Sequence, residues 1–150
     1  MMQEDNIFKR TERALYEYKD LPLKIKSIDA DIECLENDIT LKAISYEEKS
    51  GPTNAFSSSV ENEVIRREEK MTENILRLKK DKLLYKNRKI KIELALESLS
   101  EQERKLVELR YFSRPKKEWV EIGCKMNTTH TYCNMLRVDI INKISKIIFN

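Results

Sequence analysis

Glycine and proline are scarce in this sequence. Only two Gly and three Pro occur in 150 residues, so few positions favour a turn or end a helix through the backbone alone. Charged residues make up 37% of the chain and hydrophobic residues 40%, with Leu and Ile more frequent than Val. These proportions favour long, solvated helices over a sheet or a thick globular core. We therefore predict an all-α protein.

Long hydrophobic runs are also missing. No stretch approaches the ~18 apolar residues of a transmembrane helix, so no membrane partner is expected. The N-terminal sequence MMQEDNIFKR has no apolar signal core, and we expect the chain to stay in the cytoplasm.

Cysteine and histidine are too few for a disulfide framework or a zinc site. Cys34, Cys124 and Cys133 are odd in number and widely spaced, so we expect buried, apolar thiols rather than disulfides. His130 lies three positions before Cys133, but a structural zinc ion takes four ligands and no fourth candidate is evident. No metal or cofactor is predicted.

Catalytic patterns are absent as well. The chain has one His, no Gly-rich phosphate loop and no nucleophile–base pair that a helical layout would bring together. We therefore expect a protein that is not an enzyme.

The N-terminal part carries a heptad pattern. Apolar residues recur with gaps that alternate between 4 and 3, at Leu21, Ile25, Ile28, Ile32, Leu35 and Ile39. This spacing is typical of a coiled-coil seam. We predict a helix from about residue 5 that is bent near Pro22.

A second seam follows an interruption at 45–61. Gly51-Pro52 and the surrounding polar residues predict a loop near 45–59, and Ser58 with Glu61 predicts a capped helix from Ser59. The alternating gaps then return at Met71, Ile75, Leu78, Lys82, Tyr85, Lys89, Ile92, Leu96 and Leu99. Leu76, Leu83 and Ile90 form a second row beside this seam. Residues 1–98 are thus predicted to form a long antiparallel hairpin, a coiled-coil stalk that also forms a homodimer.

Three shorter helices are predicted over 99–150. Ser100 and Glu103 match a capping box for a helix from Glu101 to about Tyr111. A second helix is expected near Lys116 to Met126, with Trp119 in its core face and with Gly123 allowing close approach of another helix. The third is expected from Thr129 to about Ile148. Its predicted inward positions are Cys133, Leu136, Ile140, Ile144 and Ile147.

The last two helices have the spacing of a helix-turn-helix, in which the second helix enters the DNA major groove. Outward residues on that helix and basic residues ahead of it are the predicted DNA contacts: Arg114, Lys116, Lys117, Thr129, His130, Thr131, Tyr132, Asn134 and Arg137. Arg suits guanine and Asn suits adenine, whereas the basic residues before the helix suit phosphates. The excess charge agrees with this, since Lys plus Arg equal Asp plus Glu over 1–94 but exceed them by three over 95–150.

A family resemblance adds to this interpretation. ALESLSEQERKLVELRYF, then EW-x-EIG-x-x-M, then Thr129 and Arg137 followed by NKI, resembles the promoter-binding helix-turn-helix of bacterial sigma factors. The departures are Gly123 for the usual Ala, Met126 for Leu and Cys133 for a Val-like residue. Met135 stands where the family often has a basic residue.

The whole chain resembles the ArpU/RinA group of phage regulators, closely at 95–123 and only in architecture before that. The resemblance implies a phage or prophage protein of the host bacterial cytoplasm. It would bind double-stranded promoter DNA and recruit RNA polymerase to late genes.

Two alternatives remain open. A small terminase-type packaging subunit also joins a helix-turn-helix to a helical hairpin, although its DNA-binding domain comes first in the chain. A helical adaptor that binds only proteins is the other, and it is favoured by Met135 and the modest net charge of +3.

Overall fold

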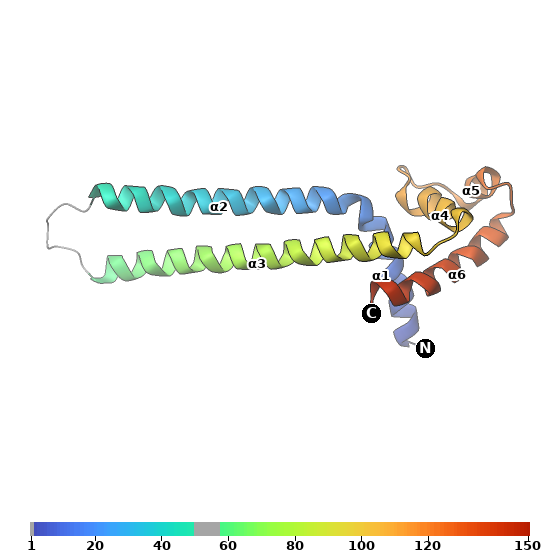
Figure 1. Cartoon of the computed structure of the whole chain (residues 1–150), viewed down its shortest axis with the longest axis horizontal. Coiled ribbons are helices and arrows are strands. Elements are labelled where there is room, and N and C mark those ends of the chain that lie inside the picture. The colour runs from blue at the N-terminus through green and yellow to red at the C-terminus, as the bar shows by residue number, and fades with distance from the viewer. Residues whose placement is uncertain (1, 50–57) are drawn as a thin grey trace. The chain divides into compact units, whose positions relative to one another are not determined.

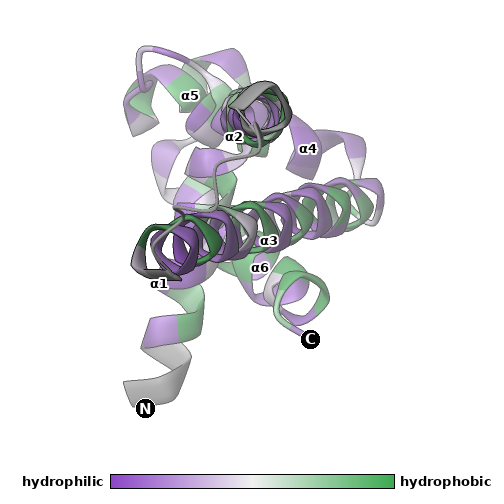
Figure 2. Ribbon diagram, turned by 90° about the vertical axis from the view of Figure 1, so that its left-hand side faces the viewer, coloured by the Kyte–Doolittle hydropathy of each residue, from purple (hydrophilic) through white to green (hydrophobic). Residues whose placement is uncertain are grey.

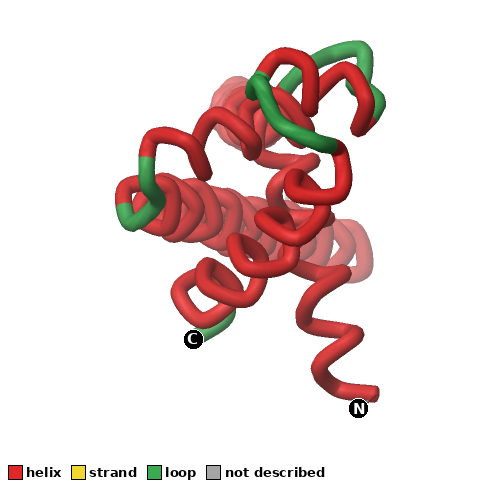
Figure 3. Tube along the Cα trace, turned by 90° about the vertical axis from the view of Figure 1, so that its right-hand side faces the viewer, coloured by secondary structure: helices red, strands yellow, loops and turns green. Residues whose placement is uncertain are grey.

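The described part of the chain is helical throughout. The computed structural model describes residues 2–49 and 58–150, and it contains helices and loops but no strand within those ranges (Figure 3). The elements in order are α1 (Met2–Glu17), the 3-10 turn η1 (Tyr18–Asp20), α2 (Leu21–Lys49), α3 (Ser58–Glu97), α4 (Glu101–Val107), the π-helical turn η2 (Glu108–Phe112), α5 (Trp119–Lys125) and α6 (His130–Ile148). The prediction of an all-α protein is confirmed.

The chain divides into two compact units, and the division differs from the predicted boundary at residue 98. The first unit is Met1–Pro22 with Lys86–Asn150, and the second is Leu23–Tyr85. The reason is that α1 packs against α6 and η2, which buries Ala14 and Leu15 in the same core as the C-terminal helices. The end of α3 joins this core through Ile92 and Ala95, which are also fully buried.

In the second unit, α2 and α3 lie side by side (Figure 1). Four side-chain contacts join them, and each step forward along α2 is a step back along α3. The contacts are Lys24 over the Tyr85 ring at 5.5 Å, the Asp29–Lys82 ion pair, the Glu36–Lys79 ion pair at 3.6 Å, and Lys42 Nζ to Met71 Sδ at 3.8 Å. The two helices are therefore antiparallel.

The apolar seams face inward as their spacing predicts. No seam position is exposed, and Ile32 and Ile75 are each only 8% exposed. Lys82 is tolerated within the seam because its ammonium pairs with Asp29. Along α3, hydrophobic residues recur between hydrophilic ones (Figure 2). The second row on α3 remains uncovered, since Leu76, Leu83 and Ile90 are each more than half exposed.

The predicted interruptions are present with adjusted bounds. The 3-10 turn at 18–20 separates α1 from α2, and Pro22 follows in the first turn of α2, where its missing N–H has no helical acceptor to lose. Helices extend into both ends of the predicted loop near 45–59, since α2 continues to Lys49 and α3 begins at Ser58. The remainder of that loop, 50–57, lies outside the described residues.

The core of the first unit contains the predicted face of α6 with two additions. Cys133, Ile140 and Ile144 are fully buried, whereas Leu136 and Ile147 are half-buried. Two further α6 residues, Ile141 and Ile148, complete the buried face. The expectation of three buried cysteines was wrong for Cys34 and Cys124, which are exposed because they lie on outward helix faces.

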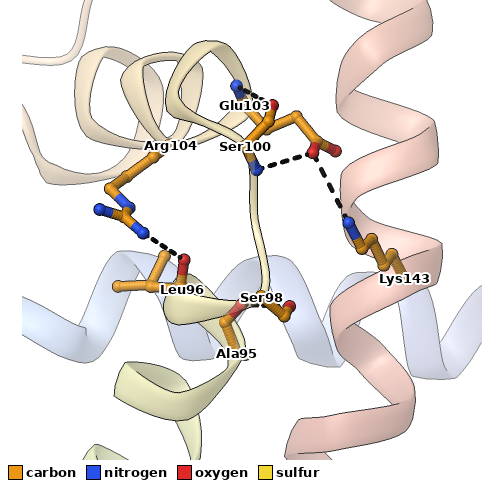
Figure 4. Close-up of polar contacts among 7 residues, drawn as sticks. All are labelled: Ala95, Leu96, Ser98, Ser100, Glu103, Arg104 and Lys143. Atoms are coloured by element: carbon orange, nitrogen blue, oxygen red, sulfur yellow. Dashed lines mark hydrogen bonds and ion pairs between the residues drawn. The ribbon is translucent and has the colours of Figure 1, made fainter.

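The predicted capping box begins α4 (Figure 4). The Ser100 hydroxyl accepts a hydrogen bond from the Glu103 N–H at 3.2 Å, and the Glu103 carboxylate accepts one from the Ser100 N–H at 3.0 Å. Lys143 of α6 lies 3.6 Å from the same carboxylate. The Ser100 hydrogen bond, followed by the Lys143 charge, lowers the pKa of Glu103.

Helix α5 begins three residues later than predicted, at Trp119 rather than Lys116. The Arg110 guanidinium donates to the Lys117 carbonyl at 2.9 Å and stacks over the Trp119 ring at 4.3 Å. Glu118 is extended, with φ −74° and ψ 154°. These tertiary contacts hold the residues before Trp119 out of the helix.

A tight turn links α5 to α6. Asn127 has a positive φ of 55°, and the Thr128 N–H donates to the Gly123 carbonyl at 2.9 Å. A Cβ atom on Gly123 would lie 2.9 Å from the Thr128 carbonyl oxygen, so glycine is needed for the turn itself to pack here. Close approach at Gly123 was predicted, and the approaching groups are the backbone of this turn and the first residue of α6, whose His130 N would lie 3.2 Å from the Cβ atom.

The capping box provides a stability test. We expect Ser100→Ala to lower the free energy of unfolding by about 1 kcal/mol, because the Glu103 N–H loses the hydroxyl that accepts its hydrogen bond. Chemical denaturation at neutral pH measures the loss.

Ser27→Ala, an exposed substitution on α2, is the matched control and should leave stability unchanged. The pKa of Glu103 is lowered in the folded state. The ionised carboxylate therefore stabilises the fold above the unfolded Glu pKa of about 4.3, and this stabilisation is lost as pH falls through the folded-state pKa. The stability difference between the wild type and Glu103→Gln should shrink over that acidic range; a difference that is constant with pH would contradict the role of Glu103.

Candidate functional site

The start of α6 presents three predicted contact residues to solvent. His130, Thr131 and Tyr132 are exposed in its first turn. Thr129 precedes them as the N-cap residue, and its hydroxyl accepts a hydrogen bond from the Tyr132 N–H at 3.2 Å. Thr129 therefore fixes the beginning of the helix, and the next three residues form its accessible tip.

Asn134 and Arg137 do not point outward as predicted, because both are half-buried and engaged within the fold. The Asn134 amide donates to the His130 carbonyl at 3.3 Å, and its oxygen accepts from Arg137 Nη1 at 3.3 Å. Both ends of the amide are thus occupied. These two bonds hold the Asn134 amide against its own helix.

Arg137 is held by α1. Its Nε lies 2.9 Å from Glu12 Oε1, and the Tyr111 hydroxyl donates to the same oxygen at 2.7 Å. Arg137 Nε is buried and makes no hydrogen bond of good geometry. Its interaction with Glu12 is therefore an ion pair. Burial, followed by the Glu12 hydrogen bond, raises the pKa of Tyr111.

Two aromatic rings complete the environment of Arg137. Its guanidinium lies 5.4 Å from the centre of the Phe8 ring and 5.7 Å from that of Trp119. No local sequence pattern signals this arrangement, because α1, η2, α5 and α6 each contribute to it. The prediction that Arg137 faces outward was wrong for this reason.

The predicted basic residues before α5 lie near α1 and η1. Arg114 pairs with Asp20 at 2.9 Å, and this hydrogen bond raises the pKa of the guanidinium. The Lys116 ammonium lies over the Tyr16 ring at 4.9 Å. Both side chains remain exposed to solvent despite these contacts.

Lys117 belongs to a small charge cluster on α5. The ammonium groups of Lys117 and Lys125 each lie 3.8 Å from Glu121 Oε1. The neighbouring Lys125 lowers the pKa of Lys117, which is the effect expected when two cations share one carboxylate. The segment 113–129, which leads into α6, contains four Lys or Arg residues and two Glu and therefore has a net charge of +2.

Exposed apolar residues continue along α6, and they were not predicted as a group from the sequence. Tyr132 is 42% exposed, Met135 62% and Val138 42%. We refer to these three residues as the α6 apolar strip. Their spacing of three places them along one side of the helix, and Met135 lies opposite the buried face. The sequence signal that could have identified the strip is the spacing of three between Tyr132, Met135 and Val138, which places apolar residues away from the predicted core positions.

Other kinds of site are not evident within residues 2–49 and 58–150. No group of three His, Cys, Asp or Glu side chains in these ranges could hold a metal ion. None of the helices in the same ranges has the length and apolar character needed to cross a membrane.

The described residues define an all-helical protein, in whose first unit the exposed beginning of α6 follows a segment of net positive charge. Residues 8–146 match a protein family described as "Protein of unknown function (DUF722)", and the chain belongs to this family. No curated protein and no solved structure matches the chain significantly.

A double-mutant cycle tests the link between α1 and α6. Glu12→Ala and Arg137→Ala should each lower the free energy of unfolding, and the two losses should fall short of additivity by about 1 kcal/mol. Denaturation of the two single variants and the double variant gives this coupling.

A cycle between Glu101 and Arg137 is the control, since no contact joins these residues, and its coupling should be near zero. Tyr111→Phe should also be destabilising, because it removes the hydroxyl that donates to Glu12. Additive losses for Glu12 and Arg137 would contradict the ion pair.

Proposed function

We propose that the protein is a sequence-specific DNA-binding transcription activator of a phage or prophage, with a sigma-like helix-turn-helix in 99–150. It acts on late-gene promoters and recruits RNA polymerase there. The observation that carries the proposal is the exposed first turn of α6, capped by Thr129 and placed beside positive charge.

The geometry of α5 and α6 supports this proposal. The two helices contact each other and are joined by Met126–Thr129, a short connection whose Asn127 has a positive φ. In a helix-turn-helix, the second helix lies in the major groove and its N-terminal residues contact base edges. His130, Thr131 and Tyr132 occupy those positions.

The basic residues have the properties of phosphate contacts. Lys116 and Arg114 are exposed, and Lys117 lies in a cluster with more positive than negative charge. A phosphate near Lys117 and Lys125 would relieve the repulsion between the two ammonium groups. These residues would fix the position of the protein on DNA, and the start of α6 would read the sequence.

Arg137 and Asn134 have a different role in the proposal from the one their sequence positions indicate. Arg137 joins α6 to α1 through Glu12, and Asn134 orients Arg137. Thr129 contributes through the N-cap. Direct contacts with bases are therefore assigned to His130, Thr131 and Tyr132.

A protein-binding adaptor is the second candidate. The observation in its favour is the α6 apolar strip, because exposed apolar side chains can mark a protein interface. Binding of duplex DNA separates the two candidates.

The proposal is tested by enrichment of bound fragments from the parent genome. Purified full-length protein should retain one or a few duplexes that lie ahead of a block of structural genes. Retention of a packaging origin would instead indicate a terminase-type subunit. Failure to bind any duplex, even at low ionic strength, would remove the proposed function and leave the adaptor.

Salt dependence tests the phosphate contacts. Replacing Lys116 and Lys117 together with Gln should reduce the slope of log affinity against log salt by about two units, since each phosphate contact contributes about 0.9. Binding of an enriched duplex over a series of salt concentrations measures the slope.

Lys70→Gln with Lys80→Gln is the matched control, because both lysines are exposed on α3 in the second unit. It should leave the slope unchanged. An unchanged slope for the Lys116 and Lys117 variant would show that neither side chain contacts a phosphate.

The proposed activator acts as a homodimer through the uncovered apolar row of α3. Leu76 is 62% exposed, Leu83 58% and Ile90 53%, so this row can pack against a second copy. Seam residues Leu78 and Tyr85 are directed to α2 instead, as the contact of Lys24 with the Tyr85 ring indicates.

We expect Leu76→Glu with Leu83→Glu to convert a dimer into a folded monomer, because two charges would be buried in the interface. Sedimentation gives the mass, and circular dichroism checks that the helices remain. Leu23→Glu, an exposed substitution on α2, should leave the dimer intact. A wild-type monomer would refute dimerisation.

A further inference from the structure

The accessible face of α6 is short of charge. Within its first three turns the one formal cation is Arg137, and that guanidinium is engaged by Glu12, Asn134 and two aromatic rings. The Asn134 amide is occupied at both ends. The groups that usually recognise guanine and adenine are thus directed into the fold of the first unit.

The residues that remain exposed are three polar or charged ones, His130, Thr131 and Asp139, and the three of the α6 apolar strip. Met135 is 62% exposed and lies at the centre of the outward face, and Tyr132 and Val138 flank it. Along the helix axis these residues cover about 9 Å at about 1.5 Å per residue. This length corresponds to roughly three base-pair steps of duplex DNA at about 3.4 Å each.

We infer that the α6 apolar strip recognises the 5-methyl groups of thymine in the major groove. This inference rests on the proposed function and names the chemical feature that the same site reads. Thymine is the base that presents a methyl group in the major groove, and an apolar side chain is the partner suited to it. Met135 makes the central contact because it projects furthest from the core.

DNA fits the α6 apolar strip better than a protein surface does. A stable protein interface covers about 800 Å² on each partner, which is more than three partly exposed side chains provide. The surroundings are complementary to a polyanion, since Lys117 and Lys125 form a net positive cluster on the adjoining helix. His130 and Thr131 add hydrogen-bonding groups at the tip of α6.

The expected consequence is a site in which thymines within a window of about three or four base pairs carry much of the specificity. Removing one contacted methyl should weaken binding about fourfold, the equivalent of one buried methyl group. Replacing thymine with deoxyuridine removes this methyl and leaves base pairing and the O4 acceptor in place.

The experiment begins with selection of duplexes from a random-sequence pool by the full-length protein. The enriched duplex is then prepared with each thymine replaced singly by deoxyuridine, and affinities are measured for every version. Wild-type protein should lose about fourfold at one or more thymines within the window. Met135→Ala and Met135→Gln should bind the thymine and deoxyuridine versions equally at a contacted position.

Leu41→Ala is the matched control, because Leu41 is 64% exposed and lies on α2 in the second unit. It should keep the wild-type loss at each deoxyuridine. Since Met135 is an exposed residue, circular dichroism of its variants should match the wild type, which separates a contact effect from unfolding.

Two outcomes overturn the inference in different ways. An enriched duplex that tolerates deoxyuridine at every thymine refutes recognition of methyl groups but leaves DNA binding intact. In that case, Met135 variants with unchanged DNA affinity would assign the strip to a protein partner. Failure to enrich any duplex refutes the proposed function, and the inference with it.

Discussion

The Glu12 carboxylate organises the first unit. One of its oxygens receives the Tyr111 hydroxyl and lies 2.9 Å from Arg137 Nε, so a single acidic group links α1, η2 and α6. An arginine that is half-buried without a counter-charge is unfavourable, and α1 supplies that charge. The same packing buries Ala14 and Leu15, which explains why the N-terminal helix belongs with the C-terminal helices.

This constraint determines which chemistry α6 can offer. With Arg137 and Asn134 engaged inside the first unit, Asp139 is the one formally charged residue among the exposed side chains of the first three turns, and the others are polar, aromatic or apolar. The positive charge lies instead on the segment before α6, around Lys116, Lys117 and Lys125. In the proposed DNA-binding role, these basic residues would contact phosphates and the start of α6 would contact bases, a division that is usual in DNA-binding proteins.

The second unit follows simpler rules. The alternating gaps of 4 and 3 predict the seam between α2 and α3, and a lysine within that seam is neutralised by Asp29. The heptad spacing does not specify what packs against the second row of α3, which consists of Leu76, Leu83 and Ile90. A row of exposed leucines is consistent with a partner helix, and its occupant in the proposal is a second copy.

The sequence by itself determined the features that depend on near neighbours. The heptad seams, the break before Pro22, the Ser100–Glu103 capping box, the Thr129 cap and most of the buried face of α6 all follow from residues within a few positions of each other. The exposure of the candidate site residues was predicted only in part. His130, Thr131 and Tyr132 are exposed as expected, whereas their function stays a prediction.

Only the tertiary structure decided the boundary between the units, the late start of α5 and the inward direction of Arg137. Each depends on residues that are distant in the chain: Leu15 in the shared core, Arg110 against Trp119, and Glu12 against Arg137. A local pattern specifies which face of a helix is apolar, but it does not specify which other helix supplies the opposite charge. That choice depends on which surfaces meet when the chain folds.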